Sequence, residues 1–201
     1  MKKNDTLFQK IVIATKNEGK LQEICDLLAN VIPVMLTYKD IDWISPEETG
    51  STFAENAFIK ASHVARATGL PALADDSGLC ITKLNGAPNI FSARWAKEGS
   101  GFVSAIERVH KELNGAMSDA VFKSVVSICL PDNEHFEFEG IMHGNIVFPS
   151  QGPIIGYESI FVPDGYLCSL SSLPEKERQK KHYRTIAIKK FENFIKDNIN
   201  K

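Results

Sequence analysis

The chain has 201 residues, of which 43% are hydrophobic and 24% charged, so it can bury a full core and is not a disordered protein. Its formal net charge of −2 gives no global attraction to polyanions, and no apolar run reaches membrane-spanning length, so we expect neither a nucleic acid polymer nor a membrane as a partner. Since no signal-peptide core follows Met1, we expect a cytoplasmic protein that forms a single domain over residues 1–201.

The first predicted elements are a strand, a tight turn and a helix. Residues 11–15 form an apolar run typical of a buried strand, and helical apolar spacing begins after Lys20, with Asn17 as the cap. Such a turn presents free backbone N–H groups to an anion, and Thr15, Asn17 and Lys20 add polar side chains, so a triphosphate would fit there. The Walker and G-x-G-x-x-G spacings are absent. Taken alone, the spacing favours a simpler interpretation, in which Asn17 only caps the helix and Lys20 is solvated.

A second helix has clear limits in the sequence. Thr52 and Glu55 form a capping box at its start, and Gly69 and Pro71 stop it. We therefore expect the helix to run between these signals.

A polar strip is predicted on this second helix. Asn56, Lys60 and His63 lie about one helical turn apart, and Glu48 precedes the helix. The strip either lines a cleft or is a solvated face, and each residue taken alone favours the solvated face.

The next segment, residues 71–79, leads an apolar run into Asp75 and Asp76. We predict strands on either side of a turn at this pair of acids. Adjacent ionised carboxylates near a buried edge must be paired, hydrogen-bonded or bound to a metal. Mg²⁺ typically takes one or two carboxylates and completes its shell with water and phosphate oxygens. The alternative is an acidic surface turn, which Asp-Asp-Ser-Gly taken alone favours, whereas the apolar flanking residues and the motifs elsewhere in the chain favour the metal.

The rest of the chain predicts a mixed α/β fold. Residues 101–113 are expected to form a helix, residues 121–130 and 136–147 a pair of antiparallel strands, and the apolar stripe with Ala187, Phe191 and Ile195 a final amphipathic helix. Arg94 follows a loop with glycine and proline. It either approaches the phosphates or is an ordinary surface arginine.

Several of these segments together resemble the inosine/xanthosine triphosphate pyrophosphatases, the Ham1/ITPase family. The resemblance is dense between residues 11 and 96 and weaker beyond them, and it rests on residues 15–20, 48–57, 70–79 and 86–94. It implies an ITPase-like, Ham1/Maf-like α/β fold, with a mixed sheet and two lobes around a central cleft, in a homodimer. It also implies Mg²⁺-dependent cleavage of nucleoside triphosphates of deaminated purines, such as dITP, ITP and XTP, to the monophosphate and pyrophosphate.

The resemblance, carried over residue by residue, implies a phosphate and metal group. Its members are Thr15, Asn17 and Lys20 on the phosphates, Lys60 on the leaving pyrophosphate, and Glu48, Asp75 and Asp76 at Mg²⁺. Asp76 is implied as the base for the attacking water, because the water must be oriented and deprotonated while cations neutralise phosphoryl charge. Ser77 and Arg94 are implied on the substrate.

Departures from the family lie in the half that is expected to recognise the base. The family has Phe-Gly-Tyr-Asp-Pro where this chain has Ile155, Gly156, Tyr157, Glu158 and Ser159, so a stacking aromatic ring is lost and the carboxylate lies one methylene further out. The family's Lys and Ser-His-Arg correspond to Arg178 and to His182, Tyr183 and Arg184. Tyrosine then stands where histidine is expected, unless the alignment slips by one residue.

Three functions remain open from the sequence. The first is a pyrophosphatase of dITP, ITP and XTP, in which Arg184 recognises a carbonyl-bearing purine edge. The second has the same chemistry with altered base specificity, because of the departures above. The third is a catalytically silent nucleotide-binding homologue, and the intact set of acids and lysines argues against it.

Overall fold

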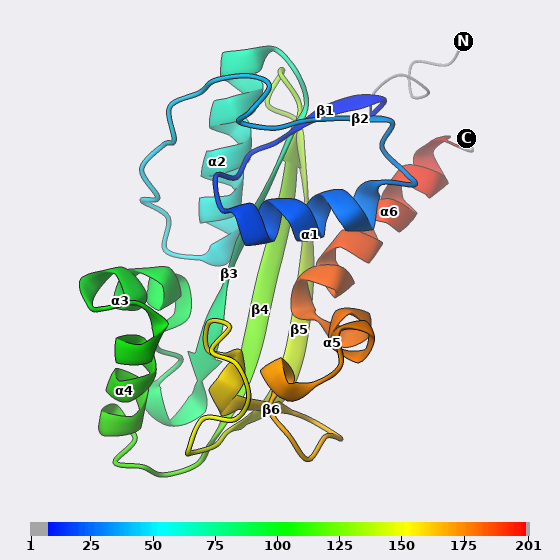
Figure 1. Ribbon diagram of the computed structural model, residues 1–201. Helices are drawn as coiled ribbons and strands as arrows, with labels where there is room; N and C mark the ends of the chain where they lie inside the picture. The colour runs from blue at the N-terminus through cyan, green and yellow to red at the C-terminus, as the bar shows by residue number, and fades with distance from the viewer. Residues whose placement is uncertain (1–7, 200–201) are drawn as a thin grey trace. The chain divides into compact units, whose positions relative to one another are not determined.

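Six strands form one mixed sheet in the computed structural model, which describes residues 8–199, with the backbone only at 198 and 199 (Figure 1). The strands are β1 (Lys10–Ile13), β2 (Val34–Leu36), β3 (Ala72–Ile81), β4 (Ser118–Cys129), β5 (His135–Ile146) and β6 (Phe161–Pro163), in the order β2-β1-β3-β4-β5-β6. β1 pairs in parallel with β2 and β3, whereas β5 pairs antiparallel with β6. The predicted mixed-sheet α/β class is therefore confirmed.

The helices follow the predicted order along the chain. They are α1 (Glu18–Leu28), α2 (Phe53–Thr68), α3 (Ser92–Glu98), α4 (Phe102–Glu112), α5 (Glu175–Lys181) and α6 (Tyr183–Ile199), with short 3-10 turns η1 (Thr82–Leu84), η2 (Asn89–Phe91), η3 (Glu158–Ile160) and η4 (Leu170–Ser172). The predicted limits of α2 are confirmed, since Thr52 caps it and Gly69 ends it in the left-handed conformation at φ 68°. Between residues 8 and 199, no helix combines the length and the apolar character that a membrane span requires.

The chain divides into two compact units. The first contains Ser124–Gly140 and the described parts of Met1–Asp76 and Ile186–Lys201, and the second contains Ser77–Lys123 and Ile141–Thr185. β3, β4, β5 and α6 each contribute residues to both units. These units correspond to the two lobes that the resemblance implied, and a single domain over residues 1–201 remains a prediction.

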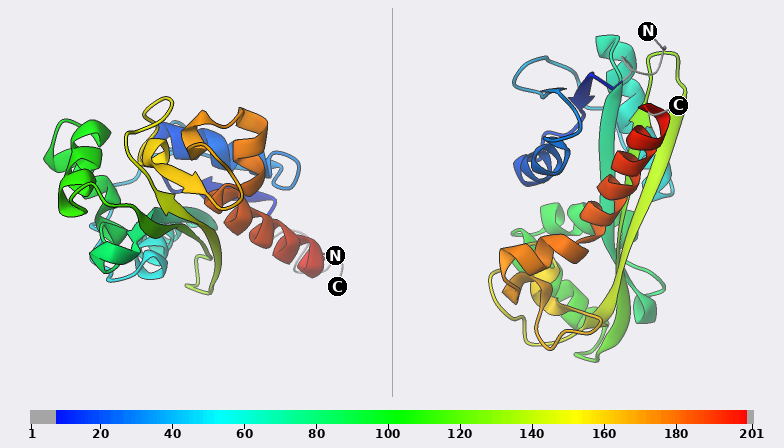
Figure 2. Two further views of the ribbon diagram at one scale, coloured as in Figure 1. Left: turned by 90° about the horizontal axis from the view of Figure 1, so that it is seen from below. Right: turned by 90° about the vertical axis from the view of Figure 1, so that its right-hand side faces the viewer.

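In the first unit, the alternation of side chains along β1 and β3 builds two cores on opposite faces of the sheet. Ile11, Ile13 and Leu73 pack in one buried cluster with residues of α1 and α6. Val12, Ala72 and Ala74, one position out of phase, pack in another with residues of α2. Figure 2 shows α1 and α2 on opposite sides of the sheet. Whether a residue in this part of β3 has an odd or an even number therefore decides which helix its side chain packs with.

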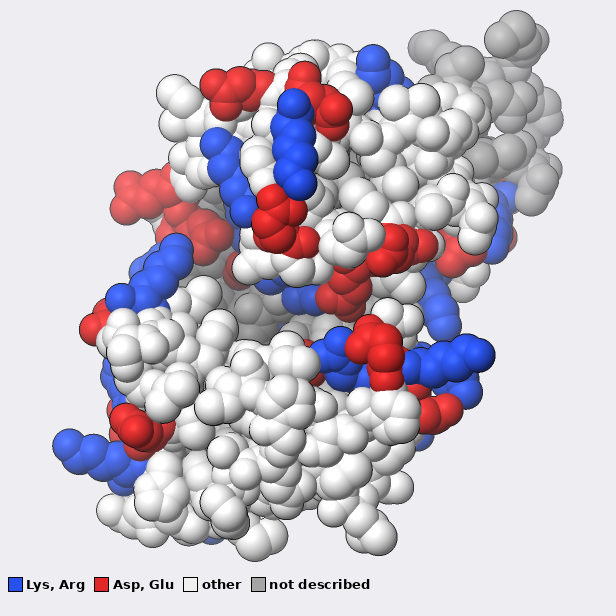
Figure 3. Space-filling view, viewed as in Figure 1, with Lys and Arg blue, Asp and Glu red and all other residues white. Residues whose placement is uncertain are grey.

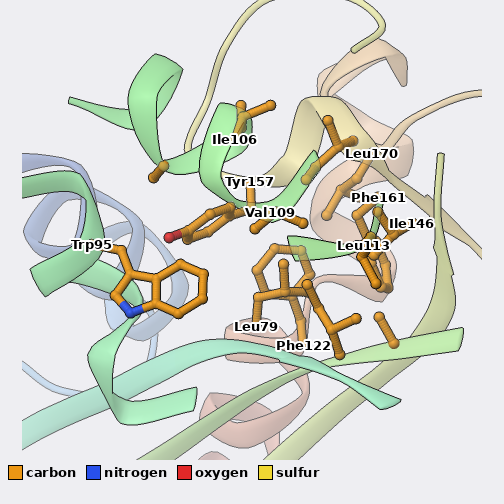
Figure 4. Packing of buried hydrophobic residues seen from close by; sticks show 14 of the residues in the cluster. Leu79, Trp95, Ile106, Val109, Leu113, Phe122, Ile146, Tyr157, Phe161 and Leu170 are labelled. Carbon is orange, nitrogen blue, oxygen red and sulfur yellow. The ribbon is translucent and has the colours of Figure 1, made fainter. Parts of the chain in front are cut away.

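The second unit has its own aromatic core (Figure 4). The rings of Phe122 and Phe161 meet edge to face with centroids 4.8 Å apart. Tyr157 is buried in the same cluster, and its hydroxyl donates a hydrogen bond of 3.1 Å to the carbonyl of Ser92. This hydrogen bond connects the first residue of α3 to the residue just before η3.

One predicted element is wrong. β3 runs without interruption from Ala72 to Ile81, so the expected turn at Asp75 and Asp76 does not form. A turn would expose both acids to water, but both are buried, because each lies on a face of the strand where a lysine is available. The other expected helices and strands are present, and α3 and α5 were not predicted.

Candidate functional site

The adjacent acids of β3 are separated by the strand itself. Asp75 has the parity of Leu73, which packs with α1, and Asp76 has the parity of Ala74, which packs with α2. Each acid accordingly binds a lysine from a different helix. The repulsion between the two carboxylates is reduced because they lie on opposite faces of the strand and each binds its own ammonium group.

Asp75 lies in a fully buried position with two partners. Lys20 Nζ of α1 lies 2.7 Å from Asp75 Oδ2, and the Asp75 side chain has no exposed surface. The hydroxyl of Ser124 on β4 donates a hydrogen bond to Asp75 Oδ1. Both oxygens of this buried carboxylate are therefore engaged, as the cost of burying an ion requires.

Asp76 and Glu48 converge on one lysine. Lys60 Nζ of α2 lies 2.9 Å from Asp76 Oδ1 and 3.0 Å from Glu48 Oε1. The second oxygen of Asp76, Oδ2, is buried and has no hydrogen-bond partner among residues 8–199. A buried carboxylate oxygen without a partner is costly, and a bound cation or water would relieve that cost.

The pKa values of this cluster follow from its burial and its charges. Burial raises the pKa of Asp76 above its usual value, although the nearby ammonium groups of Lys60 and Lys20 oppose the shift. Burial alone would lower the pKa of Lys60, but Asp76 and Glu48 together outweigh it, so this pKa is raised. Lys60 is therefore a permanent cation, while Asp76 is a carboxylate whose affinity for protons is increased. Increased basicity suits a group that takes a proton from water.

The loop that carries Glu48 is fixed by α2. The backbone N–H of Gly50 donates a hydrogen bond of 2.8 Å to Asn56 Oδ1, and Asn56 is fully buried. A Cβ atom at position 50 would lie 2.7 Å from both Asn56 Oδ1 and Glu55 Cβ, which is closer than real Cβ contacts. Glycine is needed at position 50 because the loop passes so near the start of α2.

The loop before α1 has features of both predictions made for it, the helix cap and the anion site. Asn17 Oδ1 accepts a hydrogen bond of 3.0 Å from the N–H of Lys20, and Thr15 Oγ1 accepts one of 3.2 Å from the N–H of Asn17. Asn17 is thus a helix cap, as the simpler interpretation holds. Lys20, in contrast, is not merely solvated, because its ammonium group binds Asp75.

These residues fit a divalent cation held by two carboxylates. In the part of the chain that the structure describes, no three or more His, Cys, Asp or Glu side chains gather into a group that could hold a metal. Glu48 and Asp76, however, both bind the ammonium group of Lys60, and Asp76 Oδ2 has no hydrogen-bond partner in the described part of the chain. Two protein carboxylates match the usual needs of Mg²⁺, which takes its other ligands from water and phosphate. Asp75, the third predicted metal residue, directs its oxygens at Lys20 and Ser124.

A second polar group lies in the second unit. Glu158 of η3 is buried, with Oε2 3.3 Å from Arg178 Nη1 and Oε1 3.3 Å from His182 Nε2. Arg184 is also buried, and its Nη2 donates a hydrogen bond of 3.1 Å to the hydroxyl of Ser77. The structure therefore joins Glu158 to Arg178 and His182, and Arg184 to Ser77, although the partners are distant in sequence.

The remaining predicted substrate residues have different surroundings. Tyr183 is buried, and its ring stacks on that of Phe122 with centroids 4.7 Å apart. Ile155 is 41% exposed, and Gly156 follows it in the left-handed region at φ 57°. The guanidinium of Arg94 is exposed and lies over the ring of Phe91, in accord with an ordinary surface arginine.

Two contributors to these groups were missed in the sequence. Ser124 stands at the start of a fully buried run that also contains Ser127, so the sequence does not show which of the two hydroxyls binds a partner. Asn56 was expected in a polar strip, but it is buried and holds the Glu48 loop. No local pattern indicates that partner.

Comparison with known proteins identifies the family of this chain. A family model described as the Ham1 family matches residues 11–194. A protein of Rhodospirillum centenum named dITP/XTP pyrophosphatase is 41% identical over 184 residues, which cover 89% of this chain and 91% of that protein. A protein of the same name from Caulobacter vibrioides is 40% identical over 192 residues, covering 94% and 98%.

Solved structures show the same fold. A HAM1 protein from Coxiella burnetii superimposes with a TM-score of 0.86 at 32% identity, covering 94% of this chain and 98% of that one. The Ham1 protein of Staphylococcus aureus gives a TM-score of 0.84 at 32% identity, with the same coverage. The chain therefore belongs to the Ham1 family.

Proposed function

We propose that this protein is a nucleoside-triphosphate pyrophosphatase that hydrolyses dITP, ITP and XTP to the monophosphate and pyrophosphate with Mg²⁺. The observation that carries the proposal is the cluster in which Glu48, Lys60 and Asp76 meet, where a buried oxygen of Asp76 has no hydrogen-bond partner among the described residues. Burying the Asp76 carboxylate costs stability, and a costly arrangement of charged groups of this kind is typical of a functional site. The names of the relatives supply the reaction, and the cluster supplies the chemical groups for it.

In this proposal, each of the site residues in the first unit contributes to the reaction. Asp76 orients the attacking water and accepts its proton. Lys60 stabilises the negative charge on the departing pyrophosphate, and Lys20, Thr15 and Asn17 hold the phosphates near the start of α1. Mg²⁺, held by Glu48 and Asp76, would neutralise phosphate charge and lower the pKa of the water. We propose no direct metal contact for Asp75, since both of its oxygens are engaged.

The residues of the second unit are proposed to recognise the base. Glu158, Arg178, His182, Arg184 and Ser77 offer both donors and acceptors to a purine edge. Altered base specificity is the second candidate, because exposed Ile155 offers an aliphatic surface where the family has an aromatic ring. An aliphatic side chain lacks the π-face that stacks on a base, so the base is expected to be held more weakly or in a different way.

One assay tests the proposed function. Pyrophosphate release is measured with Mg²⁺ from dITP, XTP, dATP, dGTP and dTTP, for the wild type and for Asp76→Asn. We expect preference for dITP and XTP, and a loss of at least about a hundredfold in kcat for the variant, because an amide cannot accept the proton. A preference for another base would favour the second candidate. If the wild type binds triphosphates but releases no pyrophosphate from any of them, a silent nucleotide-binding protein is the remaining function.

We also propose that the protein is a cytoplasmic homodimer. Several large apolar side chains of the second unit are exposed, among them Phe91, Phe102, Val103, Ile154 and Ile155. In the middle of the face of that unit seen in Figure 3, few side chains are charged. Exposed apolar surface of this kind marks interaction sites. Sedimentation velocity is expected to give twice the mass of the chain, and a monomer at micromolar concentration would contradict the proposal.

A further inference from the structure

Ser124 is a buried hydroxyl with a specific partner. It lies on β4 with no exposed surface, on the same face of the strand as Val126 and Ile128, which pack in the core with α1. Its hydroxyl donates a hydrogen bond to Asp75 Oδ1 on β3. Because these strands are neighbours in the sheet and the surrounding core is closely packed, the position of this hydroxyl is fixed.

Asp75 connects this hydroxyl to a partly exposed cation. Its Oδ2 lies 2.7 Å from Lys20 Nζ, and the Lys20 side chain is 24% exposed while that of Asp75 is fully buried. The three residues come from β4, β3 and the first turn of α1, all within the first unit. The contacts run from a rigid buried donor to a mobile side chain that reaches the surface.

The two contacts of Asp75 together restrict the position of the Lys20 ammonium group. The terminal torsion of an aspartate is broad, so a carboxylate with a single partner can turn. The Ser124 hydroxyl fixes one oxygen and thereby aims the other at Lys20. Lysine has a flexible stem that loses considerable rotamer freedom when it binds an anion. Holding the ammonium in place beforehand reduces that loss and improves the binding of phosphates.

We infer that Ser124 is a positioning residue for the phosphate-binding lysine: it acts through Asp75 to hold Lys20, without touching the nucleotide itself. The inference rests on the proposed function, in which Lys20 binds the phosphates. It also gives Asp75 a purpose in the site that needs no contact with a metal.

The chain offers a matched control for Ser124. Ser127 lies on the same strand with no exposed surface, and its hydroxyl has no hydrogen-bond partner among residues 8–199. It is adjacent to Val126 and Ile128 and so points to the other face of β4. Ser124→Ala and Ser127→Ala are therefore the same chemical change in the same buried strand, and only the first removes a contact to Asp75.

A double-mutant cycle tests the inference. kcat and KM for dITP are measured for Ser124→Ala and Ser127→Ala, each in the wild type and in Lys20→Met. Ser124→Ala is expected to lower kcat/KM about tenfold, mainly through KM, and to have less than about a twofold effect once Lys20 is absent. Ser127→Ala is expected to change kcat/KM less than about twofold in both backgrounds. Equal losses for Ser124→Ala with and without Lys20 would overturn the inference.

Two further measurements keep the test decisive. If Ser124→Ala does not fold, Ser124→Cys, which has a weak donor of similar size, takes its place in the cycle. Binding of inorganic tripolyphosphate is measured by calorimetry for the same variants. If the wild type releases no pyrophosphate, the proposed function fails, and the coupling between positions 124 and 20 in tripolyphosphate affinity still decides the inference. Absence of that coupling, or of any tripolyphosphate binding, would reject it.

Discussion

At the scale of single residues, the carboxyl group of Asp76 links stability to pH. Its pKa in the folded protein is raised, chiefly by burial, so the folded state binds this proton more tightly than the unfolded state does. The contribution of Asp76 to stability is therefore complete below its unfolded pKa and is lost as the pH rises through its folded pKa. The ionised, partly unsatisfied carboxylate is the form that the fold tolerates less well.

Asp76→Asn is expected to remove this dependence, because the amide does not titrate. In metal-free buffer, the free energy of unfolding of the variant should increase relative to the wild type as the pH rises from about 3.5 to about 7. Urea denaturation at several pH values measures this difference. A constant difference over the whole range would show that burial does not shift the pKa of Asp76.

At the scale of elements, the loop before α2 places Glu48, and Gly50 is the position where that loop is most constrained. Gly50→Ala would bring a methyl group within 2.7 Å of Asn56 Oδ1 and Glu55 Cβ, so the loop has to move. We expect a loss of about 1–3 kcal/mol in the free energy of unfolding and at least about a tenfold loss of kcat per folded molecule.

Gly69→Ala is the control at the other end of the same helix. Gly69 has φ 68°, and among the described residues no heavy atom beyond its chain neighbours lies within 4 Å of the position that its Cβ would take. The change should cost about 1 kcal/mol of stability through backbone strain but leave kcat unchanged. If Gly50→Ala alters stability and kcat no differently from Gly69→Ala, the loop does not position Glu48.

The elements also show what the sequence could predict. Local signals were sufficient for α1 and α2, because Asn17, Thr52 and Gly69 act on their own backbones. The path of β3 through Asp75 and Asp76 was mispredicted, because two acids before Ser-Gly are typical of a turn. They stay in the strand because α1 and α2 cover opposite faces of the sheet and each provides a lysine. These contacts depend on the tertiary structure, so the local sequence does not reveal them.

The base-recognition group was still harder to predict. Glu158 lies 20 residues before Arg178 and 24 before His182, and no periodicity connects it to them. The resemblance to the family suggested these positions, while composition and spacing did not. Parity in β3 was the one available signal that went unused: Leu73 and Ala74 belong to different cores, so the acids that follow must face different helices.

At the scale of the whole molecule, a ligand that binds only the folded state stabilises all of it. Mg²⁺ bound by Glu48 and Asp76 is expected to raise the free energy of unfolding by about 1.4 kcal/mol at roughly ten times its dissociation constant. The ion would meet the Lys60 ammonium at the same two carboxylates, so the affinity without nucleotide should be modest.

Thermal unfolding with increasing Mg²⁺ measures this effect, and three variants locate the ligands. Glu48→Gln and Asp76→Asn should abolish the Mg²⁺-dependent rise in Tm, because each removes a carboxylate that faces Lys60. Asp75→Asn should keep the rise while lowering the starting Tm, since the oxygens of Asp75 bind Lys20 and Ser124. Loss of the Mg²⁺ effect in Asp75→Asn, with its retention in Glu48→Gln, would move the metal to the other face of β3.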